Sequence, residues 1–393
     1  MPYLEILRVF LRLGLTSFGG PVAHIGYFHD EFVTRRRWVS QTQFTSWLAV
    51  CQALPGPASS QLGFLIGWHR GGLGGALLAW AGFTLPSALV LVLLAIYGLS
   101  VQADWVTGLI HGLKIVAVVV VAQAVWSMYR GLCKEASTQL LAVLGFALSV
   151  ALGGWLGQIG AIVVGGVVAL VFYQSQSVRS DTPVALAHAP SRTLGLTLVG
   201  LLLGTLFLLP WFASLAPTLA LFDSFYRAGA LVFGGGHVVL PLLESATVAS
   251  GAVSADAFLT GYGLAQAVPG PLFTFAAWLG ALDATLPGWW GATIALVAIF
   301  LPGLLLVVGI MPFWGEISRT QKAMAALAGV NAAVVGVLAA AWVDPIVTSS
   351  ISSLTDVAIA AIGAALLLWR KYPIWVVVIA IPLLTILAHW LSL

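Results

Sequence analysis

Long apolar runs alternate with short polar segments along the chain. Many of these runs reach about 20 residues, the length that a helix needs to cross the hydrocarbon core of a bilayer. Clear examples are Gly74–Gly98, Gly153–Tyr173, Thr193–Phe212, Trp289–Ile310 and Trp375–Leu393. Because lipid cannot satisfy exposed backbone polar groups, continuous apolar runs of this length form helices. The pattern therefore predicts an all-α integral membrane protein.

The composition agrees with this prediction. Of the 393 residues 60% are hydrophobic and 7% are charged, whereas a soluble domain carries about 25% charged residues. The net charge of +3 lies in short loops, which indicates membrane topology rather than nucleic-acid binding. The N-terminal 20 residues contain charges and lack a cleavage site, so we expect a retained N-terminus. No motif predicts an enzyme, a metal site or a cofactor.

The chain also repeats itself. RLGLTSFGGP (Arg12–Pro21) aligns with RAGALVFGGG (Arg227–Gly236), and QALPGP (Gln52–Pro57) aligns with QAVPGP (Gln266–Pro271). The copies keep the same order, and the offset between them stays close to 215 residues. Chance would scatter such matches, so the sequence predicts two homologous halves.

Three regions follow from this repeat. Residues 1–175 form the N-terminal half, residues 176–214 contain a polar loop and one linking span, and residues 215–393 form the C-terminal half. A single extra span turns the second half upside down relative to the first. Inverted repeats with broken helices are typical of secondary transporters.

The distribution of basic residues favours this inversion. If Ile6–Phe32 and Thr42–Trp68 fold as re-entrant hairpins, Arg35–Arg37 and Arg70 lie on one side of the membrane. The remaining basic loops fall on the same side, which the positive-inside rule makes cytoplasmic. We therefore expect a cytoplasmic N-terminus and a C-terminus outside. Hairpins give nine crossings, whereas counting every segment gives thirteen, and a kinked, tilted helix stays open as the alternative.

The repeated motifs break apolar segments with glycine and proline. A helix that begins inside the membrane leaves up to four backbone N–H groups unpaired, and together with the helix dipole these attract an anion. Proline suits the first turn of such a helix, and glycine allows a close approach to its backbone. The breaks therefore predict a site for a small oxyanion, with packing kinks as the simpler interpretation. The predicted positions are Gly19, Gly20, Pro55, Gly56, Pro57, Gly234, Gly235, Pro269, Gly270 and Pro271.

Polar side chains near the breaks are further candidates. Those with hydroxyl or amide groups are Ser59, Ser60, Thr274, Gln52, Gln266 and Asn331. Lys114 lies in an apolar run and has two open interpretations, a charge for the anion or an ammonium group that reaches the membrane surface. Candidates for gating or coupling are Arg12, Arg227, His24, His237 and Glu244. For these residues a position at the edge of the apolar layer is the simpler interpretation.

Two long segments carry a resemblance to a known family. FLRLGLTSFGGPVAHIGYFHDEFV with QALPGP, and FYRAGALVFGGGHVVLPLLE with QAVPGP, resemble the chromate ion transporter family in its long-chain, two-half form. The resemblance implies a bacterial inner-membrane protein that exports chromate, confers chromate resistance and uses secondary energetics, with sulfate as an analogue or exchange partner. The second half has Gly236 where the first has Pro21, so the two tips need not bind alike.

Other functions stay open from the residues alone. A channel or a carrier for another small anion or solute predicts conductance or uptake that is insensitive to oxyanions. A membrane-embedded metalloenzyme would use His24, His29 and His237, but the spacing of a known ligand motif is missing. The glycine-rich segment Gly71–Gly82 suits helix packing within one chain or in a homodimer.

Overall fold

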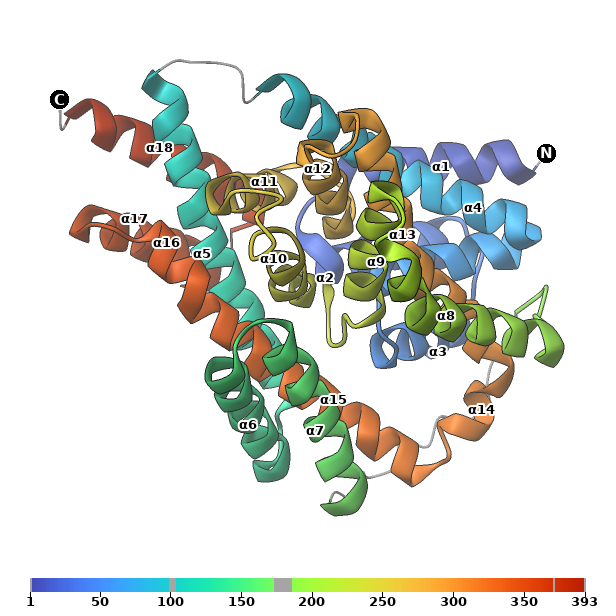
Figure 1. Cartoon of the computed structure of the whole chain (residues 1–393). Coiled ribbons are helices and arrows are strands. Elements are labelled where there is room, and N and C mark those ends of the chain that lie inside the picture. Colours follow the sequence, from blue (N-terminus) through green and yellow to red (C-terminus); the bar gives the residue numbers. More distant parts are fainter. Residues whose placement is uncertain (1, 99–103, 173–185, 370–371, 392–393) are drawn as a thin grey trace.

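A computed structural model of the chain describes residues 2–98, 104–172, 186–369 and 372–391 (Figure 1). These residues form helices and connections without strands, so the prediction of an all-α protein is confirmed. Seven of the helices are long and apolar enough to cross a membrane. Three shorter apolar helices are Ala136–Leu152, Leu272–Leu282 and Leu354–Trp369. If Leu272–Leu282 belongs to a hairpin, the other two and the seven long helices give the nine crossings of the hairpin interpretation.

The helices of the first half and the linker are α1 (Pro2–Thr16), α2 (Gly20–His29), η1 (Asp30–Arg35), α3 (Gln41–Ala53), α4 (Ala58–Tyr97), α5 (Asp104–Leu132), α6 (Ala136–Leu152), α7 (Gly154–Phe172) and α8 (Arg192–Ala213). Those of the second half are α9 (Pro217–Ala230), η3 (Gly236–Val238), α10 (Val239–Thr247), α11 (Ala255–Ala267), η4 (Leu272–Thr274), α12 (Phe275–Leu282), α13 (Gly288–Ile310), η5 (Met311–Phe313), α14 (Trp314–Ile317), α15 (Gln321–Ala341), η6 (Trp342–Val347), α16 (Thr348–Ser350), α17 (Leu354–Ala364), η7 (Ala365–Trp369) and α18 (Ile374–Leu391).

The chain reverses direction inside α4. Gly71 and Gly72 have non-helical backbone angles, and a Cβ built on Gly67 would lie 2.5 Å from the carbonyl oxygen of Gly75. In a straight helix residues eight positions apart are separated by about 12 Å along the axis. The part of α4 before this reversal, residues 58–70, is called α4a below, and it pairs with α3 as a hairpin.

The two hairpins of the first half return to the same end of the molecule. The guanidinium group of Arg36, directly after η1, donates to a carboxylate oxygen of Glu5 in α1 at 2.8 Å. Arg70, at the end of α4a, lies 3.8 Å from the same carboxylate. Both guanidinium groups lie over the ring of Trp38. The structure thus folds both predicted segments as hairpins and brings their basic ends together, as the charge pattern predicts.

The first helix of each half packs closely on a long apolar helix of the same half. Gly14 on α1 faces the carbonyl oxygens of Gly82 and Phe83 on α4, and Gly229 on α9 faces the carbonyl oxygen of Ile299 on α13. A side chain at either glycine would collide with main-chain atoms. Because these positions match in the repeat, the two halves use the same packing.

The halves exchange their central helices. α5 of the first half packs on α17 and α18, and α15 of the second half packs on α6 and α7 (Figure 1). Gly112 on α5 meets Pro382 on α18, and Gly329 on α15 meets Gly165 on α7. These contacts again join matching positions of the repeat. Each half therefore completes its core with a helix from the other.

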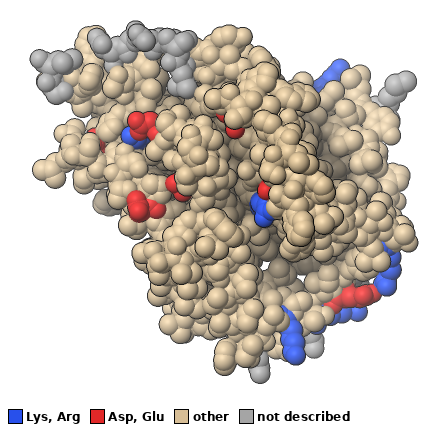
Figure 2. Space-filling view, in the orientation of Figure 1, with Lys and Arg blue, Asp and Glu red and all other residues tan. Residues whose placement is uncertain are grey.

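Much of the surface is apolar. In Figure 2 most of the visible face is free of charged residues. Helix α8 is the extreme case. Only 6% of its most apolar 18-residue stretch is buried inside the molecule, and its side chains Phe207 and Trp211 are exposed. A surface of this kind suits contact with lipid. We conclude that the chain is a multi-pass membrane protein.

Candidate functional site at the helix breaks

The four helix breaks lie together where the two halves meet. The backbone N–H of Gly56 donates to the carbonyl oxygen of Val232 at 2.7 Å, and the N–H of Gly270 donates to that of Ser17 at 3.0 Å. Ser17 and Val232 are equivalent positions in the repeat, as are Gly56 and Gly270. Each Pro-Gly-Pro break therefore docks onto the Gly-Gly break of the other half in a reciprocal pair.

Glycine is needed at both Pro-Gly-Pro breaks. Gly56 and Gly270 have φ angles of 121° and 116°, which residues with a side chain rarely adopt. A Cβ on Gly56 would lie 3.0 Å from the Cα of Gly303, and one on Gly270 would lie 2.6 Å from Oγ of Ser87. Gly303 and Ser87 are also equivalent in the repeat. The tip of each half is thus fitted against the long helix of the other.

A helix begins directly after each break. α2 begins at Gly20, α4a at Ala58, η3 at Gly236 and η4 at Leu272, and η3 and η4 lead into α10 and α12. A Cβ built on Gly236 would lie 3.3 Å from the ring of Pro21 and 3.9 Å from the side chain of Leu272. Three helix starts therefore meet at Gly236. Their N–H groups and dipoles favour a negative charge nearby.

Buried donors without acceptors surround the breaks. Oγ of Ser17, Oγ of Ser60, Oγ1 of Thr84 and Nε2 of Gln266 have no hydrogen-bond partner among the described residues. An unsatisfied buried donor costs about 1–3 kcal/mol, so each of them favours an accepting oxygen beside it. Ser17 and Thr84 were not predicted. A hydroxyl directly before Phe-Gly-Gly is a visible signal for Ser17, whereas Thr84 lies on α4 three residues before Ser87, which faces Gly270 through tertiary packing.

One histidine of each half lies near the breaks and is hydrogen-bonded. Nε2 of the buried His24 lies 3.2 Å from the carbonyl oxygen of Ser17, and its Nδ1 lies 3.5 Å from Oγ of Ser59. Because a carbonyl can only accept, Nε2 carries the hydrogen. His24 thus donates to the same carbonyl that receives the Pro-Gly-Pro break. In the second half, Nδ1 of His237 lies 2.7 Å from the hydroxyl of Tyr262.

The predicted amide and hydroxyl ligands divide into two groups. Gln266 and Asn331 are buried, and Oδ1 of Asn331 would lie 3.7 Å from a Cβ built on Gly234. Gln52, the repeat partner of Gln266, is exposed on α3. The hydroxyl of Thr274 donates to a main-chain carbonyl of its own turn at 2.8 Å. Gln266 and Asn331 are therefore the better placed of these candidates.

The cationic candidates lie away from the breaks. Nζ of Lys114 lies 2.7 Å from a carboxylate oxygen of Asp256, which is in the first turn of α11 and about 17 Å along that helix from the break that follows it. Arg227 donates to both oxygens of Asp223 at 2.8 and 2.9 Å, and Arg12 is exposed on α1. The structure does not support Lys114 as an anion ligand, because its charge is used in an ion pair. The donors at the breaks are neutral.

The histidines of the metalloenzyme interpretation do not come together. Within the described ranges no group of three His, Cys, Asp or Glu side chains is placed to hold a metal ion. His29 lies 2.6 Å from the amide oxygen of Gln41, away from His24 and its partners. Glu244 also lies apart from the breaks, in a separate cavity with Asp344.

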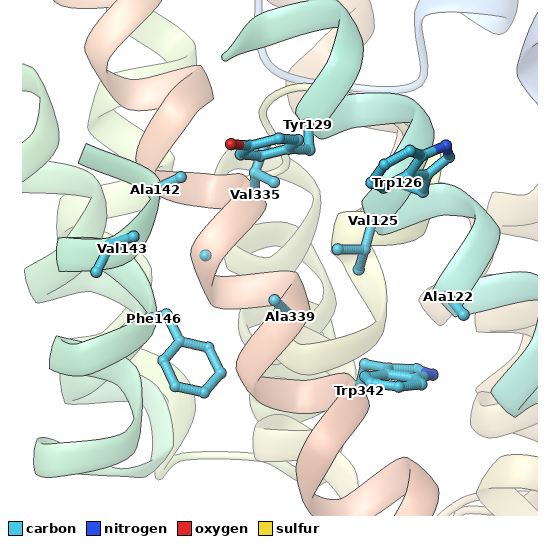
Figure 3. Close-up of a pocket in the computed structure, with 11 residues that line it drawn as sticks. Ala122, Val125, Trp126, Tyr129, Ala142, Val143, Phe146, Val335, Ala339 and Trp342 are labelled. Atoms are coloured by element: carbon cyan, nitrogen blue, oxygen red, sulfur yellow. The ribbon is translucent and has the colours of Figure 1, made fainter. Parts of the chain in front are cut away.

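Figure 3 shows an apolar pocket between α5, α6 and α15. It has a volume of about 420 Å³. Its aromatic side chains are Trp126, Tyr129, Phe146 and Trp342, and no charged residue lines it. Moving a charge into such surroundings is unfavourable. The pocket therefore suits an acyl chain better than an anion, and the breaks remain the candidate site.

Comparisons with known proteins agree with the two-half organisation. The model of the family described as "Chromate transporter" matches twice, at residues 4–172 and 219–386, which shows that the halves are homologous. A chromate transport protein of Pseudomonas aeruginosa is 30% identical over 397 residues, which cover 100% of this chain and 92% of that protein.

Two further relatives cover most of the chain. A probable chromate transport protein of Synechococcus elongatus is 30% identical over 354 residues, or 86% of this chain and 83% of that protein. A chromate transport protein of Cupriavidus metallidurans is 27% identical over 370 residues, or 93% and 88%. No solved structure matches the chain.

Proposed function

The chain belongs to the chromate transporter family, and on that premise we propose that it exports chromate from the cytoplasm by secondary, alternating-access transport. The relatives are named as transport proteins, so the chain is a transporter rather than an enzyme. We assign the chromate site to the four helix breaks. Export of this kind would confer chromate resistance on a bacterium that carries the protein in its inner membrane.

The reciprocal docking of the breaks is the observation that carries this proposal. The paired hydrogen bonds from Gly56 and Gly270 gather the helix starts at one place, and buried donors without partners surround them. Chromate is a tetrahedral dianion whose oxygens accept hydrogen bonds from several directions. Neutral donors and helix dipoles can bind such an ion without a fixed cation.

Sulfate has the same shape and charge as chromate. Hydrogen-bond donors of the kind found at the breaks recognise oxygen positions and charge, and they distinguish poorly between two tetrahedral dianions. We therefore expect sulfate to compete for the same site. Selective transport of chromate in the presence of excess sulfate would contradict this part of the proposal.

We also propose an inverted arrangement with the N-terminus in the cytoplasm. It is supported by the basic cluster at one end, where Arg36 and Arg70 converge on Glu5, and by the positive-inside rule. Inverted repeats allow one set of contacts to open as the matching set closes. The equivalence of the Gly56 and Gly270 contacts fits this mechanism, because each closes the break of the other half.

Uptake of radiolabelled chromate into energised everted membrane vesicles tests the function. Everted vesicles convert export into uptake, and we expect uptake by the wild type that falls when sulfate is in excess. Gly56→Leu and Gly270→Leu should abolish it while the protein stays in the membrane, because their side chains would collide with Gly303 and Ser87.

Gly251→Leu is the matched control for these two variants. Gly251 also has a positive φ angle, 78°, but a Cβ there meets nothing within 4 Å, so it tests backbone strain without touching the breaks. Normal uptake by Gly56→Leu would remove the breaks from the site. Uptake absent from wild-type vesicles that contain folded protein would exclude chromate, and a conductance insensitive to oxyanions would favour a channel.

A further inference from the structure

An acidic cavity lies between the two halves, apart from the candidate chromate site. It has a volume of about 390 Å³ and is enclosed by the turn between α6 and α7, by α10, and by the junction of α15 with η6. Two carboxylates line it, Glu244 on α10 and Asp344 on η6, together with the amide of Gln158 on α7. The residues described as its lining include no Lys, Arg or His. The cavity therefore carries negative charge without a basic partner on its walls.

The amide of Gln158 is fixed in one orientation. Its Nε2 donates to the carbonyl oxygen of Pro241 at 3.0 Å and to Oγ of Ser245 at 2.9 Å. Because a carbonyl only accepts, the nitrogen must face Pro241, and the amide cannot be flipped. The side chain is 7% exposed, and its Oε1 is buried without a hydrogen-bond partner. This oxygen can therefore accept a hydrogen bond or coordinate a cation.

The two carboxylates have different surroundings. Glu244 is half-buried on α10, whereas Asp344 is exposed and receives a hydrogen bond from the hydroxyl of Thr348 at 2.9 Å. Two like charges that face one cavity repel each other. A cation between them removes this repulsion and also satisfies the amide oxygen of Gln158. Oxygen ligands of this kind select hard cations such as sodium, magnesium and calcium.

We propose that this cavity binds a hard cation, held by Glu244, Asp344 and Oε1 of Gln158. The space exceeds that of a bare ion, so water completes the coordination. The site is distinct from the chromate site and its existence does not depend on the identity of the transported anion.

The position of the cavity links it to the breaks. η3 and α10 follow the Gly234–Gly235 break directly. Glu244 lies eight residues after Gly236, about 12 Å along the helix axis. α15 carries Asn331 next to the same break and ends at Ala341, and η6 with Asp344 follows it directly. A cation bound between Glu244 and Asp344 therefore ties α10 to η6, directly after α15. Its binding and release change the support of the break, which is a means of coupling cation movement to anion movement.

Direct cation binding to the purified full-length protein in lipid nanodiscs tests the proposal. Binding of radioactive sodium and of radioactive calcium is measured separately by scintillation proximity, which identifies the class of cation. We expect saturable binding of one of them to the wild type. Glu244→Gln and Asp344→Asn should weaken it at least about tenfold, because each removes a charged ligand.

Two more variants make the result decisive. Asp344→Lys places an ammonium group at the exposed mouth of the cavity, so it should abolish binding without disturbing the interior. Asp283→Asn removes a loop carboxylate that bonds Thr285, and it should bind as the wild type does. The proposal is overturned if neither cation binds the folded wild type, or if Asp344→Lys binds with unchanged affinity. Chromate uptake that survives in a protein without cation binding would separate this site from the proposed function.

Discussion

Individual side chains make the helix breaks unequal, although the backbone of the two halves is closely matched. Gln266 is buried with an unpartnered amide nitrogen, whereas its repeat partner Gln52 is exposed. Ser17 contributes a buried hydroxyl where the second half has Val232. In each of these matched pairs only one member supplies a buried donor without a partner. Donors that differ between the two halves can bind a single ion, whereas identical donors in both halves would form two equivalent sites.

The glutamine pair gives a prediction with its own control. Gln266→Leu should reduce the initial rate of chromate uptake into everted vesicles at least about tenfold, because a lost hydrogen bond to a charged ligand costs about 1.5–3 kcal/mol. Gln52→Leu should leave uptake within about twofold, since that side chain is exposed and does not face the interior. Equal losses in the two variants would mean that the amide of Gln266 does not contact the anion.

At the scale of elements, the first hairpins depend on a cluster of ionic contacts at their ends. Glu31 in η1 accepts hydrogen bonds from Arg36 at 2.6 Å and Arg35 at 3.2 Å, and Arg36 also bonds Glu5 in α1. Burial raises the pKa of Glu31, but the hydrogen bonds and charges of Arg36 and Arg35 outweigh it and hold the pKa below its ordinary value. The carboxylate therefore stabilises the folded chain in its charged form.

This linkage gives a pH-dependent prediction. The contribution of Glu31 is complete above its unfolded pKa of about 4.3 and is lost as the pH falls through the lower folded-state pKa. Glu31→Gln should lower the melting temperature at pH 7 by about 2 °C or more, measured on purified protein by thermal size-exclusion assays. The difference from wild type should shrink in acid, once the wild-type carboxyl is protonated.

Asp30 supplies the matched control for this experiment. Its side chain is 86% exposed and its nearest ionic partner is His29 at 3.7 Å, so Asp30→Asn should leave the melting temperature unchanged across the same pH range. A difference between Glu31→Gln and wild type that stays constant down to the acid limit would show that packing, rather than charge, stabilises this end of the hairpins.

At the scale of the whole molecule, the exchange of α5 and α15 makes the two halves one folding unit. Gly329 on α15 lies against the carbonyl oxygen of Gly165 on α7, and Gly112 on α5 lies against Pro382 on α18. Glycine is needed at these contacts because the helix backbones touch. The two halves are thereby joined through helices that belong to both cores.

Overpacking this contact tests the exchange. Gly329→Leu should abolish monodisperse, folded protein, because the side chain has no space between α15 and α7 and overpacking a core costs about 1–3 kcal/mol or more. Gly200→Leu on α8 should be tolerated, since a Cβ at Gly200 meets nothing within 4 Å. Fluorescence-detected size-exclusion chromatography of detergent extracts measures both variants. A folded Gly329→Leu protein would contradict the packing of α15 on α7.

Several features of the molecule followed from the sequence, because they depend on local chemistry. The apolar runs predict their helices closely: Gly153–Tyr173 becomes Gly154–Phe172, and Trp289–Ile310 becomes Gly288–Ile310. The length of an apolar run and the lack of water in the bilayer are sufficient for this. The repeated motifs likewise predict two homologous halves and breaks at glycine and proline.

Tertiary structure decided which of the candidate residues meet. Lys114 and Asp256 are 142 positions apart in the chain and form an ion pair. The sequence left the role of the Lys114 charge open, and the structure pairs it with a carboxylate away from the breaks. Gln52 and Gln266 occupy the same place in the repeat, yet one faces outward and the other inward. The docking of Gly56 on Val232 and the acidic cavity at Glu244 depend on the packing of both halves against each other. Sequence determined the helices and their breaks through local chemistry, whereas burial and long-range contact, which no local pattern encodes, determined the site.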